Sequence, residues 1–253
     1  MSAVKMGAIE MLSKLGVSAK PGKVIGIYGY SMIGKSAFAA ISCREYVGEK
    51  GMGIIFGTEA HYADDDYREM IRRLLPESNY INYCPSPEDL FGKMNLVAER
   101  RFEGRLCLIL DSLSNLALHM TADLYSRGIT DIRVISARII PVVDSAAQMF
   151  KILAVEKAAL GLVVMHASST AGTSLFRNLV PTRPSMSARV AHSLDYLLFM
   201  ESEGGSMASP RKLTPVMSRL SPVDEGKSVR FKFSEKSVAW IPEEGGPQGS
   251  AAP

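Results

Sequence analysis

The stretch GYSMIGKS, residues 29–36, decides the fold of this chain. It matches the pattern G-x-x-x-x-G-K-[ST] at every fixed position, and the glycines of that pattern let backbone N–H groups turn toward a phosphate. Residues 23–28, an apolar run after a Pro-Gly turn, predict a buried strand, and residues 37–41 begin a helix. Strand, glycine loop and helix is the order that a phosphate site requires, because the helix start adds partial positive charge.

Two side chains of this loop have specific tasks in that interpretation. Lys35 would contact the β- and γ-phosphates of ATP, and Ser36 would bind Mg²⁺. The alternative is a glycine turn with a surface lysine, which the flanking strand and helix disfavour. The predicted nucleotide-contacting residues are Gly29, Tyr30, Ser31, Met32, Ile33, Gly34, Lys35, Ser36 and Ala37.

Composition bounds the class of protein. The 253 residues, 47% of them hydrophobic and 22% charged, can bury a sizeable core, and we find no segment that would cross a membrane and no signal peptide. The three cysteines lack C-x-x-C spacing, so we expect reduced, buried thiols and a cytoplasmic protein. We expect a lead-in helix within residues 1–20, one domain over 21–241 and a disordered tail over 242–253.

Strand and helix patterns alternate through most of the chain. This alternation predicts an α/β fold with a mostly parallel twisted central sheet flanked by helices. Antiparallel strands are expected at the C-terminal edge, whereas residues 114–130 look polar and broken, and 167–187 lack periodicity. The expected strands are 23–28, 51–57, 80–83, 105–112, 162–166, 195–201, 211–220 and 228–233, and the expected helices are 3–17, 37–47, 67–75, 88–102 and 131–160, the last kinked or broken at Pro141.

Acidic residues follow two of the expected strands. Asp111 ends the apolar run 105–112, where a carboxylate can hold Mg²⁺ beside Ser36. Glu59 follows the strand 51–57, at the sheet edge where open α/β folds bind ligands. The three aspartates at 64–66 could form a metal site or cap a helix. Adjacent residues at a helix start cannot all face one ion, which favours capping.

Together these segments resemble the core ATPase domain of the RecA/RadA recombinase family. The similarity is greatest to archaeal RadA paralogues (RadB/RadC-like) that lack the N-terminal helical domain, and it covers roughly residues 15–241. Its carriers are the loop 29–36, then GTEAHYADDDYREMIRRL, LCLILDSLSNL, YSRGITD, GLVVMHAS, RVAHSLDYLLFMES and the closing block RKLTPVMSRLSPVDEGKSVRFKFSEKSV.

The resemblance implies a RecA-like P-loop NTPase with Mg²⁺-dependent ATP hydrolysis, single-stranded DNA binding and a role in homologous recombination and repair. Glu59 would orient the attacking water and act with Lys35 in catalysis, and Asp111 would bind Mg²⁺. A RadA-type recombinase or a second copy of the chain is the implied protein partner. The implied DNA-binding residues, in or beside two loops, are Arg127, Arg177, Arg183 and Arg189.

Departures from the family leave alternatives open. His166 stands near the position of the family's glutamine sensor, and it could contact a γ-phosphate or have a structural role. The arginines could belong to solvated loops, because few aromatic residues accompany them. The loop interior 30–33 is bulkier than usual, and residues 1–20 contain no phenylalanine to anchor a filament. A KaiC-like nucleotide-binding interaction module is therefore a second hypothesis.

Overall fold

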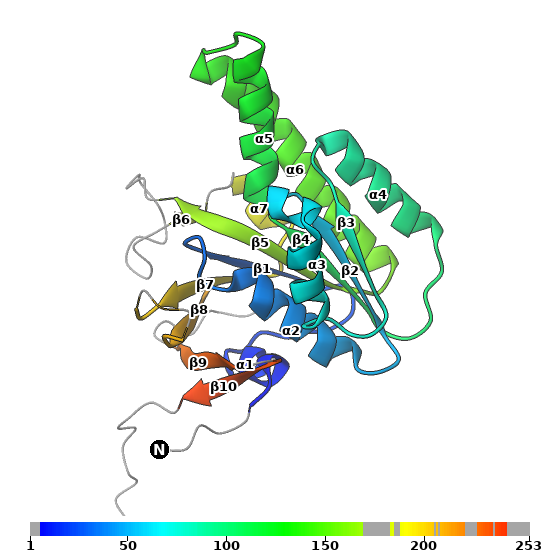
Figure 1. The fold of residues 1–253 in the computed structure, drawn as a ribbon, viewed down its shortest axis with the longest axis vertical. Helices are drawn as coiled ribbons and strands as arrows, with labels where there is room; N and C mark the ends of the chain where they lie inside the picture. Colours follow the sequence, from blue (N-terminus) through cyan, green and yellow to red (C-terminus); the bar gives the residue numbers. More distant parts are fainter. Residues whose placement is uncertain are drawn as a thin grey trace, which may run out of the picture.

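The computed structural model describes residues 6–168, 183–184, 188–204, 206, 208–220, 227–234 and 236–241. These residues form a central sheet covered by helices on both faces (Figure 1). The helices are α1 (Ala8–Lys14), α2 (Lys35–Val47), the 3₁₀ helix η1 (Ala60–Ala63), α3 (Asp65–Arg72), α4 (Pro87–Glu99), α5 (Leu113–Ser126), α6 (Ile132–Glu156) and α7 (Ala188–His192).

The strands confirm the predicted fold class. The sheet order is β10-β9-β8-β7-β1-β5-β4-β2-β3; β7 through β3 in this order run parallel, and β8 to β10 continue antiparallel. The short β6 pairs antiparallel with β5. The strands are β1 (Val24–Gly29), β2 (Met52–Gly57), β3 (Asn79–Tyr83), β4 (Leu106–Asp111), β5 (Leu160–Ser168), β6 (Arg183–Pro184), β7 (Tyr196–Ser202), β8 (Arg211–Ser218), β9 (Val229–Ser234) and β10 (Ser237–Ile241).

Two apolar layers hold the sheet. Side chains of α1, α2 and α3 pack on one face around Phe38, and those of α4, α5 and α6 pack on the other around Phe150. β1, β4 and β7 carry long apolar runs because parallel strands between two helical layers are buried on both faces. The loop 29–36 thus follows a strand in the middle of the sheet.

The segment 114–130, predicted to be polar and broken, is largely helical. Ser112 caps α5 by accepting a hydrogen bond from the Asn115 N–H, and the helix ends before Gly128, whose φ is 77°. Leu113, Leu116 and Leu124 supply the buried face that the polar residues between them obscure. α5 and α6 project together beyond the sheet (Figure 1).

Other boundaries also differ from the prediction. α6 runs unbroken through Pro141, so the alternative of a break there is wrong. β10 was not predicted, whereas the expected antiparallel run of three strands is confirmed as β7, β8 and β9; on its other edge β7 pairs parallel with β1. β6 and α7 add short elements at the end of the aperiodic region; most of 167–187 and all of 242–253 lie outside the described residues. Within the described part of the chain, no helix has the length and apolar character to cross a membrane.

Asp195 joins three elements at the start of β1. One carboxylate oxygen accepts a hydrogen bond of 2.8 Å from the Val24 N–H and pairs with Lys151 of α6, and the other lies 3.6 Å from the Lys23 ammonium. Burial alone would raise the pKa of Asp195, but these contacts outweigh it, and the pKa lies below its ordinary value. Folding therefore favours the ionised carboxylate.

We expect Asp195→Asn to lower the free energy of unfolding by about 2 kcal/mol at pH 7, because it weakens charge-assisted hydrogen bonds. The contribution of the carboxylate is complete above the unfolded pKa of about 3.9 and is lost as pH falls through the lower folded value. Urea denaturation at pH 7 and at a series below pH 4 measures the difference, and Glu103→Gln, in an exposed loop, is the control. An equal difference at every pH would contradict this account.

Candidate functional site

The loop 29–36 forms a phosphate-sized cradle between β1 and α2. Met32 and Gly34 have φ of 62° and 91°, so the backbone enters the left-handed region at both positions. Lys35, 5% exposed, donates a hydrogen bond of 2.5 Å to the Tyr30 carbonyl. Burial lowers the pKa of Lys35 to about 8, although the charges of Asp111 and Glu59 act in the opposite direction.

A cavity of about 1000 Å³ opens in front of this loop. α2, α3, α5 and the ends of β2 and β5 enclose it, so segments distant in sequence face one volume. The residues that line it include Ser31, Met32, Gly34, Lys35, Ser36, Ala37, Glu59, His61, Tyr67, Met70, Ser114, Asn115, Leu118, Thr121 and His166. The structure thereby brings most of the predicted nucleotide residues to one place.

Asp111 is fully buried at the end of β4. Its Oδ2 accepts a hydrogen bond of 2.5 Å from the Tyr62 hydroxyl, whereas Oδ1 makes no hydrogen bond within the described residues. Burial and the charge of Glu59 raise the pKa of Asp111, although Tyr62 and the neighbouring Ser36 hydroxyl act in the opposite direction. A buried carboxylate oxygen without a partner is costly.

A divalent cation would satisfy that oxygen. Mg²⁺ is commonly held by one or two carboxylates together with substrate phosphates, and Asp111 and Ser36 provide such a donor set beside the loop. Among the described residues no cluster of three His, Cys, Asp or Glu side chains could hold a metal by itself. The donors present therefore fit a cation that arrives with a nucleotide.

Glu59 stands just after β2 and is held by two histidines. Its Oε1 lies 3.2 Å from His166 Nε2, and its Oε2 lies 2.9 Å from His61 Nε2. Burial would raise the pKa of Glu59, but the contacts with His166 and His61 outweigh it and hold the pKa well below its ordinary range. Both oxygens of the predicted base thus lie beside an imidazole nitrogen.

His166 also contacts the phosphate loop. Its Nδ1 lies 3.3 Å from Ser31 Oγ, so one imidazole connects the loop to Glu59. The His166 backbone N–H donates to Ser114 Oγ of α5 at 2.9 Å, which fixes the end of β5. Sequence analysis predicted His166 near the site.

Backbone contacts fix the separation of Glu59 and Asp111. The Thr58 N–H donates to the Asp111 carbonyl at 2.8 Å, and Thr58 Oγ1 exchanges hydrogen bonds with the backbone of Ser112 at 2.6 and 3.1 Å. The peptide bond between Asp111 and Ser112 is cis. The residue before Glu59 is therefore hydrogen-bonded directly to the backbone of Asp111 and Ser112.

His61, Tyr62 and Tyr67 are site residues that the sequence analysis did not identify. Tyr62 binds Asp111, and the His61 ring packs on Tyr67 with centroids 4.0 Å apart. The sequence feature that could have identified them is their position within the segment GTEAHYADDDYREMIRRL, just after Glu59. Of the aspartates, Asp64 caps α3 through the Tyr67 N–H and Asp65 pairs with Arg68, so the preference for capping is confirmed.

The predicted DNA-binding arginines are not gathered in the described residues. Arg127, at the end of α5, is exposed but pairs with Asp123, with its Nη2 2.9 Å from Oδ2. Arg189 is exposed on α7. Arg177 lies outside the described residues, and only the backbone of Arg183, in β6, is described. Their roles stay predictions.

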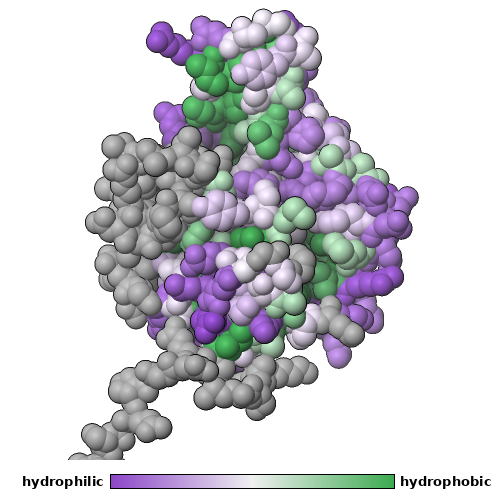
Figure 2. Space-filling model, turned by 60° about the vertical axis from the view of Figure 1, so that its left-hand side comes forward, coloured by the Kyte–Doolittle hydropathy of each residue, from purple (hydrophilic) through white to green (hydrophobic). Residues whose placement is uncertain are grey.

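The projecting hairpin of α5 and α6 also exposes apolar side chains (Figure 2). They are Leu118, Tyr125, Ile132, Val134 and Ile140. Leu118 also borders the cavity, where Met32, 89% exposed, and Met70 are exposed as well. The cavity thus has an apolar outer rim and a charged floor.

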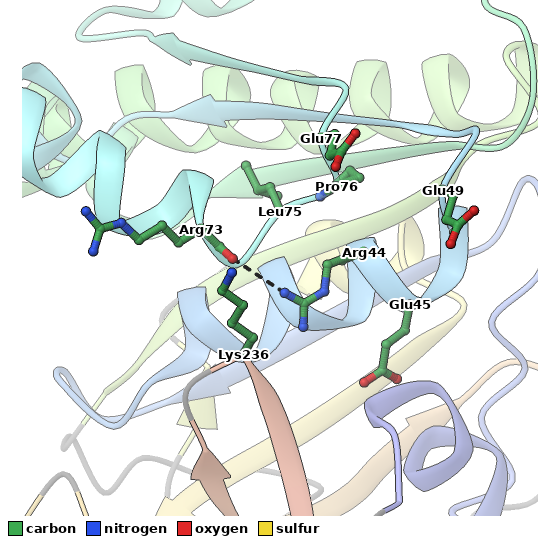
Figure 3. Close-up of a pocket in the computed structure, with 9 residues that line it drawn as sticks. Arg44, Glu45, Glu49, Arg73, Leu75, Pro76, Glu77 and Lys236 are labelled. Carbon is green, nitrogen blue, oxygen red and sulfur yellow. Dashed lines mark hydrogen bonds between the residues drawn. The ribbon is translucent and has the colours of Figure 1, made fainter.

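A second hollow, of about 600 Å³, lies beside the C-terminal half of α2 (Figure 3). Arg44, Arg73 and Lys236 share it with three glutamates, and Arg44 Nη1 donates to the Arg73 carbonyl at 3.4 Å. Because basic and acidic side chains are mixed there, the hollow indicates no particular class of ligand. It contains none of the residues of the phosphate loop.

Comparison with known proteins supports the fold. No protein-family model matches the chain. The crystal structure of the RadB recombinase is similar with a TM-score of 0.64 over 90% of this chain and 94% of that one, at 14% identity. The hemin import ATP-binding protein HmuV of Pseudomonas entomophila is 26% identical over 89 residues, 35% of each chain. This chain thus matches about a third of the length of that curated relative, and the likeness to the RadB recombinase shows that the two chains share a RecA-like fold.

The histidine contacts generate a prediction about His61. Burial lowers the pKa of His61, but the hydrogen bond and charge of Glu59 raise it above its ordinary value. We expect Glu59→Gln to lower the pKa of His61, because the carboxylate charge is removed while burial stays. NMR titration of the imidazole resonances measures this, with the exposed Glu99→Gln as a control. An unchanged pKa in Glu59→Gln would show that the two side chains are not in contact in solution.

Proposed function

We propose that this chain is a Mg²⁺-dependent ATPase of the RecA/RadA type that binds single-stranded DNA and assists or regulates homologous recombination and repair. The observation that carries the proposal is that Lys35 and Glu59 line one cavity at the carboxyl ends of parallel strands, with the buried Asp111 beside them at the end of β4. The likeness to the RadB recombinase supports the recombination role. We also infer a cytoplasmic location from the reduced cysteines.

The residues of the cradle would act mainly by positioning and charge. Amides of the loop 29–36 and the start of α2 receive the phosphates, and Lys35 neutralises the β and γ oxygens. Asp111 and Ser36 hold Mg²⁺, which supplies further neutralisation of the phosphate oxygens. Glu59 orients the water and accepts its proton. Because Glu59 is a weakened base with both oxygens occupied, hydrolysis would be slow.

Two substitutions test the chemistry. Lys35→Ala should reduce ATP hydrolysis about 100-fold or more because charge stabilisation is lost, and Glu59→Gln should reduce it about 100-fold while nucleotide binding is kept. Phosphate release is measured with and without EDTA, and thermal melting checks the fold. Lys50→Ala, at an exposed position, serves as control. Wild-type turnover in Lys35→Ala would remove the proposed function.

DNA binding would depend on Arg127 at the tip of the projecting hairpin. Phosphate contacts through arginine weaken as salt rises, because counterions compete. Asp123 neutralises Arg127 in the free protein through an exposed ion pair. The partner would be a RadA-type recombinase or a second copy, for which the exposed apolar residues of α5 and α6 offer a surface.

We expect Asp123→Asn to strengthen binding of a fluorescent single-stranded oligonucleotide a few-fold and Arg127→Ala to weaken it, because one frees a cation and the other removes it. Anisotropy titrations at 50 and 200 mM salt measure both effects, and ATPase rates are recorded with and without DNA. Asp131→Asn removes a nearby charge without touching Arg127 and is the matched control. Identical affinities for all four proteins would exclude Arg127 from the DNA interface.

A KaiC-like nucleotide-binding regulatory module is the second candidate. The capture of Glu59 by two histidines favours it, since a nucleotide could then be bound without rapid turnover. ATPase rates that are indifferent to DNA at both salt concentrations would support this alternative.

A further inference from the structure

Arg211, at the start of β8, is a charged side chain inside the protein. It is 1% exposed, and it is one of the largest fully buried side chains in the described part of the chain. Its Nε donates a hydrogen bond of 2.7 Å to the carbonyl of Ile33, within the phosphate loop. Burying a guanidinium is costly unless its donors are satisfied, so its contacts indicate what this position requires.

The rest of the guanidinium binds the segment between β7 and β8. Nη1 donates to the Ser209 carbonyl at 2.6 Å and to Ser202 Oγ at 2.9 Å, and the Ser206 carbonyl lies 3.4 Å away. The planar fork of arginine presents its donors in fixed directions, and here one guanidinium binds two backbone segments at once. Arg211 therefore joins the phosphate loop to this connection.

β7 and β9 contact the same loop. A Cβ at Gly34 would lie 2.5 Å from the Phe233 ring, and a Cβ at Gly29 would lie 2.2 Å from the Met200 carbonyl. Phe233 in turn packs edge-on against Phe231, which contacts Phe38 of α2. β7, β8 and β9 thus all contact the phosphate loop.

From these contacts we propose that Arg211 is a positioning residue of the phosphate loop, and that the β7–β8 connection is coupled to nucleotide binding. The inference rests on the proposed binding of a nucleotide at residues 29–36. Phosphate binding by amides needs the backbone already oriented, and the Ile33 carbonyl must point away from the phosphates for its neighbouring N–H groups to face them. The Arg211 guanidinium holds that carbonyl on the protein side.

Binding of a fluorescent ADP analogue with Mg²⁺ tests the role of Arg211. Arg211→Met keeps the length of the side chain but removes the donors, and we expect about tenfold weaker binding or more. Arg211→Lys keeps the charge but loses the planar fork of donors, so an intermediate affinity is expected. Lys212→Met, on the same strand with its ammonium paired to exposed Glu201, is the control and should stay within about twofold of wild type.

Hydrogen exchange separates positioning from general stability. In folded Arg211 variants, amides of residues 30–36 should exchange faster than in wild type, while those of β4 stay protected. In the wild-type protein, ADP with Mg²⁺ should slow exchange both in residues 30–36 and in residues 202–204 and 208–211. The measurement with ADP needs no variant, so it tests the coupling even if the substitutions prevent folding.

The outcomes distinguish the two proposals. Failure of wild type to bind ADP would refute the proposed function, and exchange in Arg211→Lys would still test the position of the loop. Wild-type binding with equal affinity and equal loop exchange in a folded Arg211 variant would overturn the positioning role. Protection of the loop by ADP without protection of the β7–β8 connection would overturn the coupling.

Discussion

The site depends on placing one ammonium and two carboxylates in a largely water-excluded space. Lys35, Glu59 and Asp111 are each at most 9% exposed, and charges with so little hydration must be compensated locally. The Lys35 ammonium is compensated by a hydrogen bond to the Tyr30 carbonyl and by the charges of the two acids. The Glu59 carboxylate is compensated by the imidazoles of His166 and His61. Asp111 has a hydrogen-bond partner for only one of its oxygens among the described residues. A divalent cation bound at the free oxygen would complete this compensation.

The parallel sheet makes that placement possible. β1, β2 and β4 all end at the same edge, so the phosphate loop, Glu59 and Asp111 meet although more than fifty residues separate Glu59 from Asp111 in the chain. The hydrogen bonds of Thr58 then fix the two acids relative to one another. The antiparallel strands β8 and β9 also contact the site, because Arg211 and Phe233 extend from them to the phosphate loop. The C-terminal part of the sheet is thus structural support for the site.

Local patterns predicted those parts of the site that are encoded by neighbouring residues. The loop 29–36, the strand ends at Glu59 and Asp111, and the α/β alternation are all visible in short windows. Contacts of Arg211 with Ile33, and of Tyr62 with Asp111, span 178 and 49 residues, and no local pattern reports them. α5 was missed because polar residues interrupt the pattern of its three buried leucines. The ion pair of Asp123 and Arg127, spaced i,i+4 on that helix, was missed for the same reason. β10 is short and pairs only with β9 in the sheet order, so packing rather than composition decides it.

His166 has a position that links nucleotide binding to catalysis within the proposed mechanism. Its two ring nitrogens face Ser31 and Glu59, and an imidazole has only these two groups with which to bind partners. A γ-phosphate near Ser31 would compete for the same ring, because a phosphate oxygen is a stronger acceptor than a hydroxyl. A neutral imidazole has a single N–H, so a ring that donates from Nδ1 to the phosphate cannot also donate from Nε2 to Glu59, and one oxygen of the base would become available to water. The histidine that restrains Glu59 in the free protein would then release it only when the substrate is in place, which connects slow basal turnover with a complete set of catalytic side chains.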